Sequence, residues 1–165
     1  MFQRERIADN VYSFQSEVYA QVNAGAVIGP NWAVLIDTLA LPEESLAIRD
    51  FIEQELNVPV RYIINTHGHA DHAWGNCFFP GAMIFGHPLC RQYLDTKGRA
   101  SLEETKRTNM NFRNVKLVLP QLTFHQGDLN LRVGKKTLTL FPLPGHSNDN
   151  LAVLVEEDRV LFAGD

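Results

Sequence analysis

The stretch Thr66-His67-Gly68-His69-Ala70-Asp71-His72 decides how the rest of the chain is interpreted. Three imidazoles and one carboxylate stand within six residues, directly after the apolar run 60–64, which is typical of a buried strand. Gly68 and Ala70 have almost no side chain, so the histidines beside them can approach one point. Imidazole is the commonest metal ligand in proteins, and the pattern therefore predicts a metal site at the end of a strand. A polar loop whose histidines bond only backbone groups would explain one histidine better than three.

Size and composition indicate one ordinary globular domain. The 165 residues suffice for a hydrophobic core, and 45% of them are hydrophobic while 21% are charged. The net charge of -4 gives no general reason to expect nucleic-acid binding. Two cysteines are too few for a disulfide framework and fit a reducing compartment. The start has no apolar signal core and no run reaches membrane-spanning length, so we expect a cytoplasmic protein without membrane association.

The hydrophobic pattern predicts a mixed α/β fold, with helices interleaved early and antiparallel strands late. Helices are expected from Pro42 to near Asn57, over 88–94 and over 101–111. The expected strands are 11–14, 23–28, 33–38, 60–65, 82–85, 115–119, 129–133, 137–141, 151–155 and 160–162.

Two more residues have the setting of metal ligands. His146 lies in Pro144-Gly145-His146-Ser147, and Asp165 ends Ala163-Gly164-Asp165, each shortly after a predicted strand. The order of strand, small residue and ligand thus occurs three times, which would gather the ligands at one edge of the sheets. A capping histidine and an ordinary terminal aspartate are the alternatives.

The chain resembles the metallo-β-lactamase fold superfamily in three segments. They are His67-x-His69-x-Asp71-His72, Pro-Gly-His146-Ser and Leu-Phe-Ala-Gly-Asp165, which match in order and context. The resemblance covers the chain from Val11 onwards and implies an αββα sandwich with two metals at its top edge. By position, His67, His69 and His146 resemble the ligands of the first metal. Asp71 and His72 resemble ligands of the second metal, and Asp165 resembles the carboxylate that bridges the two.

The implied chemistry is that of a metal-dependent hydrolase acting on a small molecule. Imidazoles and carboxylates suit two zinc ions, with iron or manganese as alternatives. Zinc brings the pKa of its water to about 7, which supplies a metal-bound hydroxide to attack an ester, thioester, lactone or amide carbonyl. The metals also stabilise the oxyanion that forms. Asp71 is expected to orient the water and to pass a proton to the leaving group.

Two departures refine the resemblance. The stretch Gly145-His146-Ser147-Asn148-Asp149-Asn150-Leu151 is close to that of β-lactamases with a cysteine ligand, yet Asp165 stands at the cysteine position. His72 occupies a position that this class does not use. The ligand set is instead like that of glyoxalase II and lactonases, so we do not expect a dedicated antibiotic-degrading role.

The second departure is that the family continues beyond the bridging aspartate, to a last histidine on the second metal. We therefore expect residues 1–165 to be one metallo-β-lactamase-like domain whose C-terminal part is missing. Uncovered strand edges would then favour self-association.

Other functions and residues stay open. An iron-dependent oxidoreductase resembling persulfide dioxygenases, or an inactive fragment needing a partner, is the alternative to a hydrolase. His87 and His125 are interpreted as loop or surface residues, and Cys77 and Cys90 as core residues. Trp74 and the adjacent phenylalanines fit a substrate mouth and core packing equally well.

Overall fold

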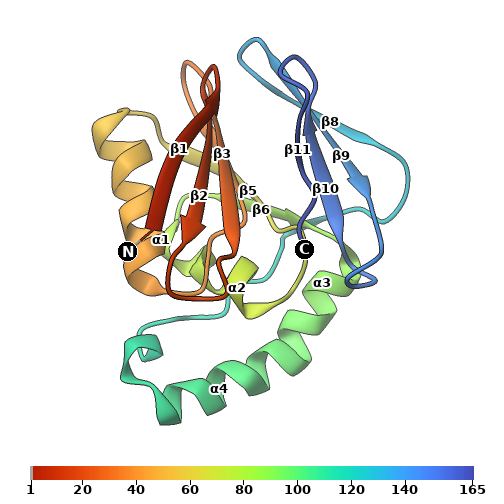
Figure 1. Cartoon of the computed structure of the whole chain (residues 1–165). Coiled ribbons are helices and arrows are strands. Elements are labelled where there is room, and N and C mark those ends of the chain that lie inside the picture. Colours follow the sequence, from red (N-terminus) through yellow and green to blue (C-terminus); the bar gives the residue numbers. More distant parts are fainter. Residues whose placement is uncertain (1) are drawn as a thin grey trace.

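The computed structural model describes residues 2–165 and contains two β-sheets that face each other (Figure 1). The larger sheet has the strand order β1 (Phe2–Ala8), β2 (Val11–Ser16), β3 (Asn23–Ile28), β4 (Ala33–Ile36), β5 (Val60–Ile64), β6 (Met83–Gly86) and β7 (Leu122–Thr123). The smaller sheet has the order β11 (Val160–Phe162), β10 (Leu151–Val155), β9 (Lys136–Pro142) and β8 (Leu129–Val133). Strands β1 to β4 and the whole smaller sheet are antiparallel, whereas β4 to β7 are parallel.

The helices mostly connect the parallel strands, as parallel pairing requires. They are α1 (Pro42–Asp50), η1 (Phe51–Glu55), α2 (Ala70–Ala73), η2 (Trp74–Phe78), α3 (Pro88–Tyr93), η3 (Leu94–Gly98), α4 (Arg99–Thr108) and η4 (Met110–Phe112). Pro42 stands in the first turn of α1 with two glutamates, which suits the positive end of a helix dipole. None of the described helices is long and apolar enough to cross a membrane.

The core is divided by the larger sheet into two layers. Strand β4 shows this directly, because all four of its residues are buried. Ala33 and Leu35 pack with Ile48 and Ile52 of the first helical segment, on one face. Val34 and Ile36 pack on the opposite face, against the inner face of the smaller sheet. Burial on both faces explains why this strand reads as a continuous apolar run rather than as an alternation.

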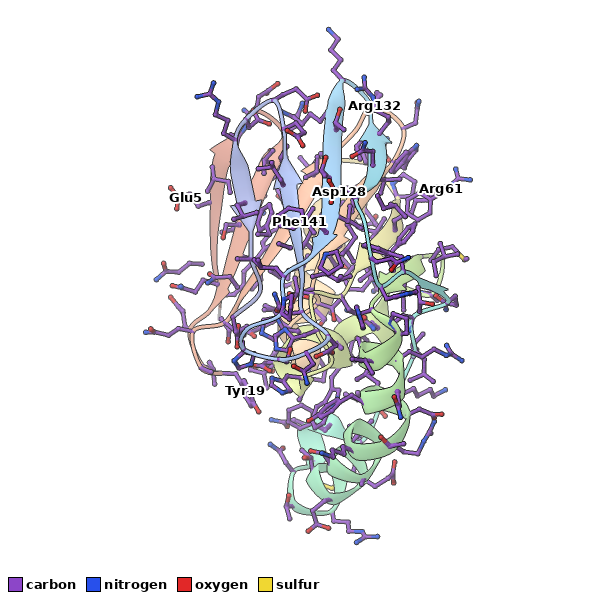
Figure 2. All side chains as sticks on the ribbon, turned by 90° about the vertical axis from the view of Figure 1, so that its right-hand side faces the viewer. Glu5, Tyr19, Arg61, Asp128, Arg132 and Phe141 are labelled. Atoms are coloured by element: carbon purple, nitrogen blue, oxygen red, sulfur yellow. The ribbon has the colours of Figure 1, made fainter. Side chains whose placement is uncertain are left out.

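This arrangement confirms the predicted α/β sandwich. In Figure 1, α1 lies outside the larger sheet, and among residues 2–165 no helix lies on the outer face of the smaller sheet. The turns between β1 and β2, β3 and β4, β8 and β9, and β10 and β11 gather at one end of the sheets (Figure 1). The loops between β2 and β3 and between β9 and β10 lie at the other end. Figure 2 shows the two ends of the sheets from the side, with Arg132 near the hairpin tips and Tyr19 near the opposite end.

Three local predictions were wrong. Strand β1 was not predicted, because five of its seven residues are exposed and three are charged; it pairs with β2 as an edge strand, where charges are common. The segment 115–119 is not a strand, because it lies against η2, where Asn76 Nδ2 donates to Val118 O over 3.2 Å. The helices expected over 88–94 and 101–111 are one helical run over 88–108, which continues through Gly98.

Candidate metal centre

The loop after β5 presents its histidines because its backbone is held tightly. A Cβ atom at Gly68 would stand 2.9 Å from Cδ1 of Tyr93 and 3.3 Å from the carbonyl oxygen of Cys90. Only a residue without a side chain fits this gap comfortably. His69 then serves as the N-cap residue of α2, with an extended backbone that separates its side chain from that of His67.

The first group of ligand atoms consists of His67, His69 and His146. Nδ1 of His69 lies 3.0 Å from Nε2 of His67 and 3.0 Å from Nε2 of His146. Two nitrogens on one tetrahedral zinc would be about 3.3 Å apart, given zinc–nitrogen bonds of about 2.0 Å. The three imidazoles therefore have the spacing of ligands around one metal ion, and their role as the ligands of the first metal stays a prediction.

The second group consists of His67, His72 and Asp165, and His67 belongs to both groups. Nε2 of His72 is buried and makes no hydrogen bond, although it lies 3.0 Å from Oδ1 of Asp165. The other oxygen of Asp165 lies 3.7 Å from Nε2 of His146. Asp165 thus stands between His72 and His146, where a bridging carboxylate would be expected. A buried ring nitrogen that makes no hydrogen bond and faces a carboxylate has the setting of a ligand for a cation.

Asp71 lies beside these groups but in neither of them. Its Oδ2 is 3.9 Å from Nε2 of His72, and its side chain is 18% exposed. The structure therefore brings five of the six predicted ligands into two groups and places Asp71 at their rim. Its role as a ligand stays a prediction.

Asp37 is the most important residue that the sequence analysis missed. It follows β4, is 2% exposed and has a φ of 58°, an uncommon angle for a residue other than glycine. Its Oδ1 accepts a hydrogen bond from Thr66 N at 2.8 Å, and its Oδ2 accepts from Thr66 Oγ1 at 2.6 Å. The same Oδ2 lies 2.7 Å from Nδ1 of His72. A signal was available, because Asp37 also follows a buried strand, next to the one that carries His67.

Burial and the neighbouring carboxylates shift the pKa values of His67 and His72 in opposite directions. Burial lowers the pKa of His67 to about 4, and the neighbouring His72 contributes in the same direction. Burial also opposes the charged form of His72, but the carboxylate of Asp37, with those of Asp71 and Asp165, raises its pKa to about 9. His67 is therefore neutral near pH 7 and offers a free lone pair for a cation.

A buried amide pair supports the segment after His72. Asn76 Nδ2 donates to Asn65 Oδ1 at 2.8 Å, and Asn65 Nδ2 donates back to Asn76 Oδ1 at 3.1 Å. Thr38 Oγ1 donates to the backbone carbonyl of His72 at 3.2 Å. These bonds tie α2 and η2 to the ends of β4 and β5, so the ligands stand on a rigid support.

Tyr19 also faces this edge, from the loop between β2 and β3. Partial burial, and then the charge of Asp71, raise the pKa of its phenol. No sequence pattern indicated a role for Tyr19, because the loop contains no motif. Tyr19 is 40% exposed and so is accessible to a bound molecule.

The remaining candidates have structural roles. His87 caps α3, its Nδ1 accepting from Leu89 N at 3.1 Å, and His125 is exposed. Cys90 is buried and Cys77 half-buried, as expected. Trp74 is 4% exposed and packs edge-on against Phe112, with ring centroids 5.5 Å apart, so it belongs to the core rather than to a substrate mouth.

Two cavities lie away from the histidine groups. A cavity of about 430 Å³ lies at the hairpin tips, lined by turn residues such as Asn10, Pro30 and Lys135. A second cavity, of about 390 Å³, lies between the sheets beside β11 and reaches Asp37 and Thr66. We assign the site by the convergence of ligand atoms, because the chemistry depends on them rather than on hollow volume.

Comparison with known proteins agrees with this geometry. The family model described as "Metallo-beta-lactamase superfamily" matches residues 19–165. Acyl-coenzyme A thioesterase MBLAC2 of Homo sapiens is 27% identical over 186 residues, covering 99% of this chain and 66% of the relative. Hydroxyacylglutathione hydrolase 1 of Vibrio vulnificus (strain YJ016) is 27% identical over 141 residues, covering 81% of this chain and 42% of the relative.

A solved structure shows the same fold. The metallo-beta-lactamase from Pontibacter korlensis superposes with a TM-score of 0.76 at 22% sequence identity, covering 99% of this chain and 71% of that one. Among the curated relatives, this chain spans 66% of the length of the thioesterase and less of the Vibrio protein.

Proposed function

The chain belongs to the metallo-beta-lactamase superfamily, and from this premise we propose that it is a metal-dependent hydrolase of a small carbonyl substrate. One observation carries the proposal, namely two groups of ligand atoms that share His67 at one edge of the sheets. Both curated relatives named above are hydrolases by name, which supports the same reaction class.

The residues present fit a pair of divalent cations. His67, His69 and His146 would hold one ion, and His72 with Asp165 would hold a second, with Asp71 near it. The mixture of imidazole and carboxylate suits zinc, with iron or manganese as alternatives. When bound, the ions would supply a Lewis acid and lower the pKa of water at the site.

The side chains of this chain have distinct tasks in such a reaction. Asp37 holds Nδ1 of His72, so that Nε2 points toward Asp165. Asp71 is partly exposed beside these groups and would hold a proton on its carboxylate before passing it to the leaving group. Tyr19 would contact the substrate at the rim, because its phenol lies near Asp71 at the exposed side.

We propose thioesters as the first substrate class to test. Acyl-coenzyme A and acylglutathione, named in the two relatives, both carry an acyl group on sulfur. Esters, lactones and amides remain members of the broader class that the site can address.

The test is a substrate panel with metal-loaded protein. Purified chain, loaded with zinc, manganese or iron(II) in turn, is assayed on an acyl-coenzyme A, an S-acylglutathione, a lactone and an aryl ester. We expect thioester hydrolysis that falls at least about 100-fold in His69→Ala, because the first group loses a ligand. His125→Ala, which changes an exposed histidine, should keep the wild-type rate.

Two results would contradict the proposal. One is turnover that is equal in the wild-type protein and in His69→Ala. The other is consumption of oxygen without hydrolysis by the iron-loaded protein, which would favour an oxidoreductase instead.

A further inference from the structure

Three segments far apart in the sequence carry the candidate ligands, and contacts between these segments must hold the ligands in position relative to one another. They are the loop after β5, the segment 143–150 between β9 and β10, and the end of the chain after β11. The segment 143–150 has little core packing, because five of its eight residues are exposed, His146 among them. Its position cannot come from core packing.

Asp149 joins this segment to the loop after β5. Asp149 is only 8% exposed, and its Oδ2 accepts a hydrogen bond from the backbone N–H of Gly68 at 2.8 Å. Gly68 stands between His67 and His69, so the bond fixes the peptide that sets the direction of both imidazoles. Two residues after Asp149, the backbone N–H of Leu151 donates to the backbone carbonyl of Thr66 at 2.7 Å, which extends the contact between the two segments.

Asn150 joins the same segment to the end of β11. It is 2% exposed, and its Nδ2 donates to Ala163 O at 2.8 Å and to Leu143 O at 3.1 Å. The first bond reaches the strand end that leads to Asp165, and the second closes the loop on itself. Gly164 fits closely here, with a φ of 75°, because a Cβ atom would stand 2.4 Å from Oδ1 of Asn150.

Asp149 and Asn150 therefore sit where all three ligand segments meet. Apart from the contacts of the His146 imidazole itself, the side-chain hydrogen bonds that leave 143–150 within the described chain come from these two residues. We propose that Asp149 and Asn150 form a clamp that positions His146 against His67 and His69 for metal binding. They are positioning residues, because neither belongs to a group of ligand atoms.

The clamp makes different predictions from a merely structural role. Asp149→Ala removes the acceptor of Gly68 N–H and should weaken metal binding about 10- to 100-fold, as loss of a group that orients ligands typically does. Asp149→Asn keeps an oxygen acceptor at the same place and should bind metal within about threefold of the wild type. The matched control is Gln121→Ala, because Gln121 Oε1 accepts from Ile84 N at 2.8 Å, a comparable bond that involves no candidate ligand.

The experiment measures zinc affinity by chelator competition and records the visible spectrum of the cobalt(II)-loaded proteins. Metal-free melting temperatures are measured alongside. Asp149→Ala and Gln121→Ala should lose similar thermal stability, while only Asp149→Ala loses affinity and changes the cobalt spectrum. If Asp149→Ala does not fold, Asp149→Glu replaces it, since one extra methylene displaces the acceptor and should weaken binding too.

The inference rests on the proposed metal site, and its failure can be told apart from the failure of that proposal. Wild-type zinc affinity in Asp149→Ala, equal losses of zinc affinity in Asp149→Ala and Gln121→Ala, or a zinc affinity of Asp149→Asn as low as that of Asp149→Ala would each overturn the clamp alone. A wild-type protein that binds neither zinc nor cobalt would overturn the clamp and the proposed function together.

Discussion

Oδ2 of Asp37 lies 2.7 Å from Nδ1 of His72, in a place where both side chains are almost completely buried. Because a carboxylate only accepts hydrogen bonds, Nδ1 of His72 carries a proton and donates it to Asp37, and this contact directs Nε2 toward Asp165. Two residues 35 positions apart thus determine which nitrogen faces the candidate metal centre. The orientation is set by the ends of two neighbouring parallel strands, β4 and β5.

Removing Asp37 should destabilise the protein strongly. Asp37→Ala leaves His72 and Thr66 buried without their acceptor, and breaking such a buried pair costs about 3–5 kcal/mol of unfolding free energy. Urea denaturation checks this value. Asp95→Ala, which breaks an exposed contact with Arg99, should cost less than about 1 kcal/mol. A loss below about 1 kcal/mol for Asp37→Ala would show that the network does not matter for stability.

The sharing of His67 predicts how metal content responds to substitution. His67→Ala should lower the occupancy of both groups, because it removes a ligand of the first ion and the side chain that both groups have in common. His146→Ala should affect mainly the first group, and Asp165→Asn mainly the second. Metal analysis of proteins dialysed against limiting zinc measures the number of ions per chain. A His67→Ala protein that loses no more metal than His146→Ala would mean that the groups do not share this ligand.

Asp71→Asn should separate catalysis from metal binding. Asp71 lies at the rim and outside both groups, so most of the metal should remain bound. The amide cannot accept and release a proton, and kcat should therefore fall at least about 100-fold. Parallel assays of hydrolysis and metal content decide the matter. Retention of most of kcat in the fully loaded variant would remove Asp71 from the mechanism.

Glu44 predicts a pH dependence of stability. Burial raises the pKa of its carboxyl from the ordinary value of 4.5, although the hydrogen bond from Ser16 opposes the shift. The folded protein therefore binds this proton more tightly than the unfolded chain, and stability falls as the pH rises through the window above 4.5. Glu44→Gln should be more stable than the wild type at pH 7, with a gap that narrows toward pH 4.5. Denaturant melts across this range would contradict the assignment if the gap stayed constant.

Gly75 is expected to tolerate no side chain. A Cβ atom there would stand 2.2 Å from the carbonyl oxygen of Thr38, a backbone atom that cannot swing away. Gly75→Ala should cost about 1–3 kcal/mol, as overpacking in a well-filled interior typically does. Gly81→Ala is the control, because no atom lies within 4 Å of the position its Cβ would take. Equal stability of the two variants would refute the tight fit of η2 against the end of β4.

The sequence was most informative where residue type and strand pattern coincide. His67, His69, His146 and Asp165 follow apolar runs, and all of them come together as expected. Asp37 was missed because a single aspartate after a strand is common, and only the parallel pairing of β4 with β5 brings it to His72. Strand β1 was missed because its charged residues carry no apolar alternation. The expected self-association stays a prediction.

The distance between the hairpin tips and the ligand edge has a practical consequence. The turns at Asn31 and Lys135 lie at the end where the cavity of about 430 Å³ opens, and no candidate ligand belongs to them. Exposed turns of this kind accept inserted residues more readily than strands do. A fluorophore, an affinity tag or a surface linkage placed there would leave the edge that carries the candidate ligands unobstructed, so the protein could be immobilised by one end while its chemistry is followed at the other.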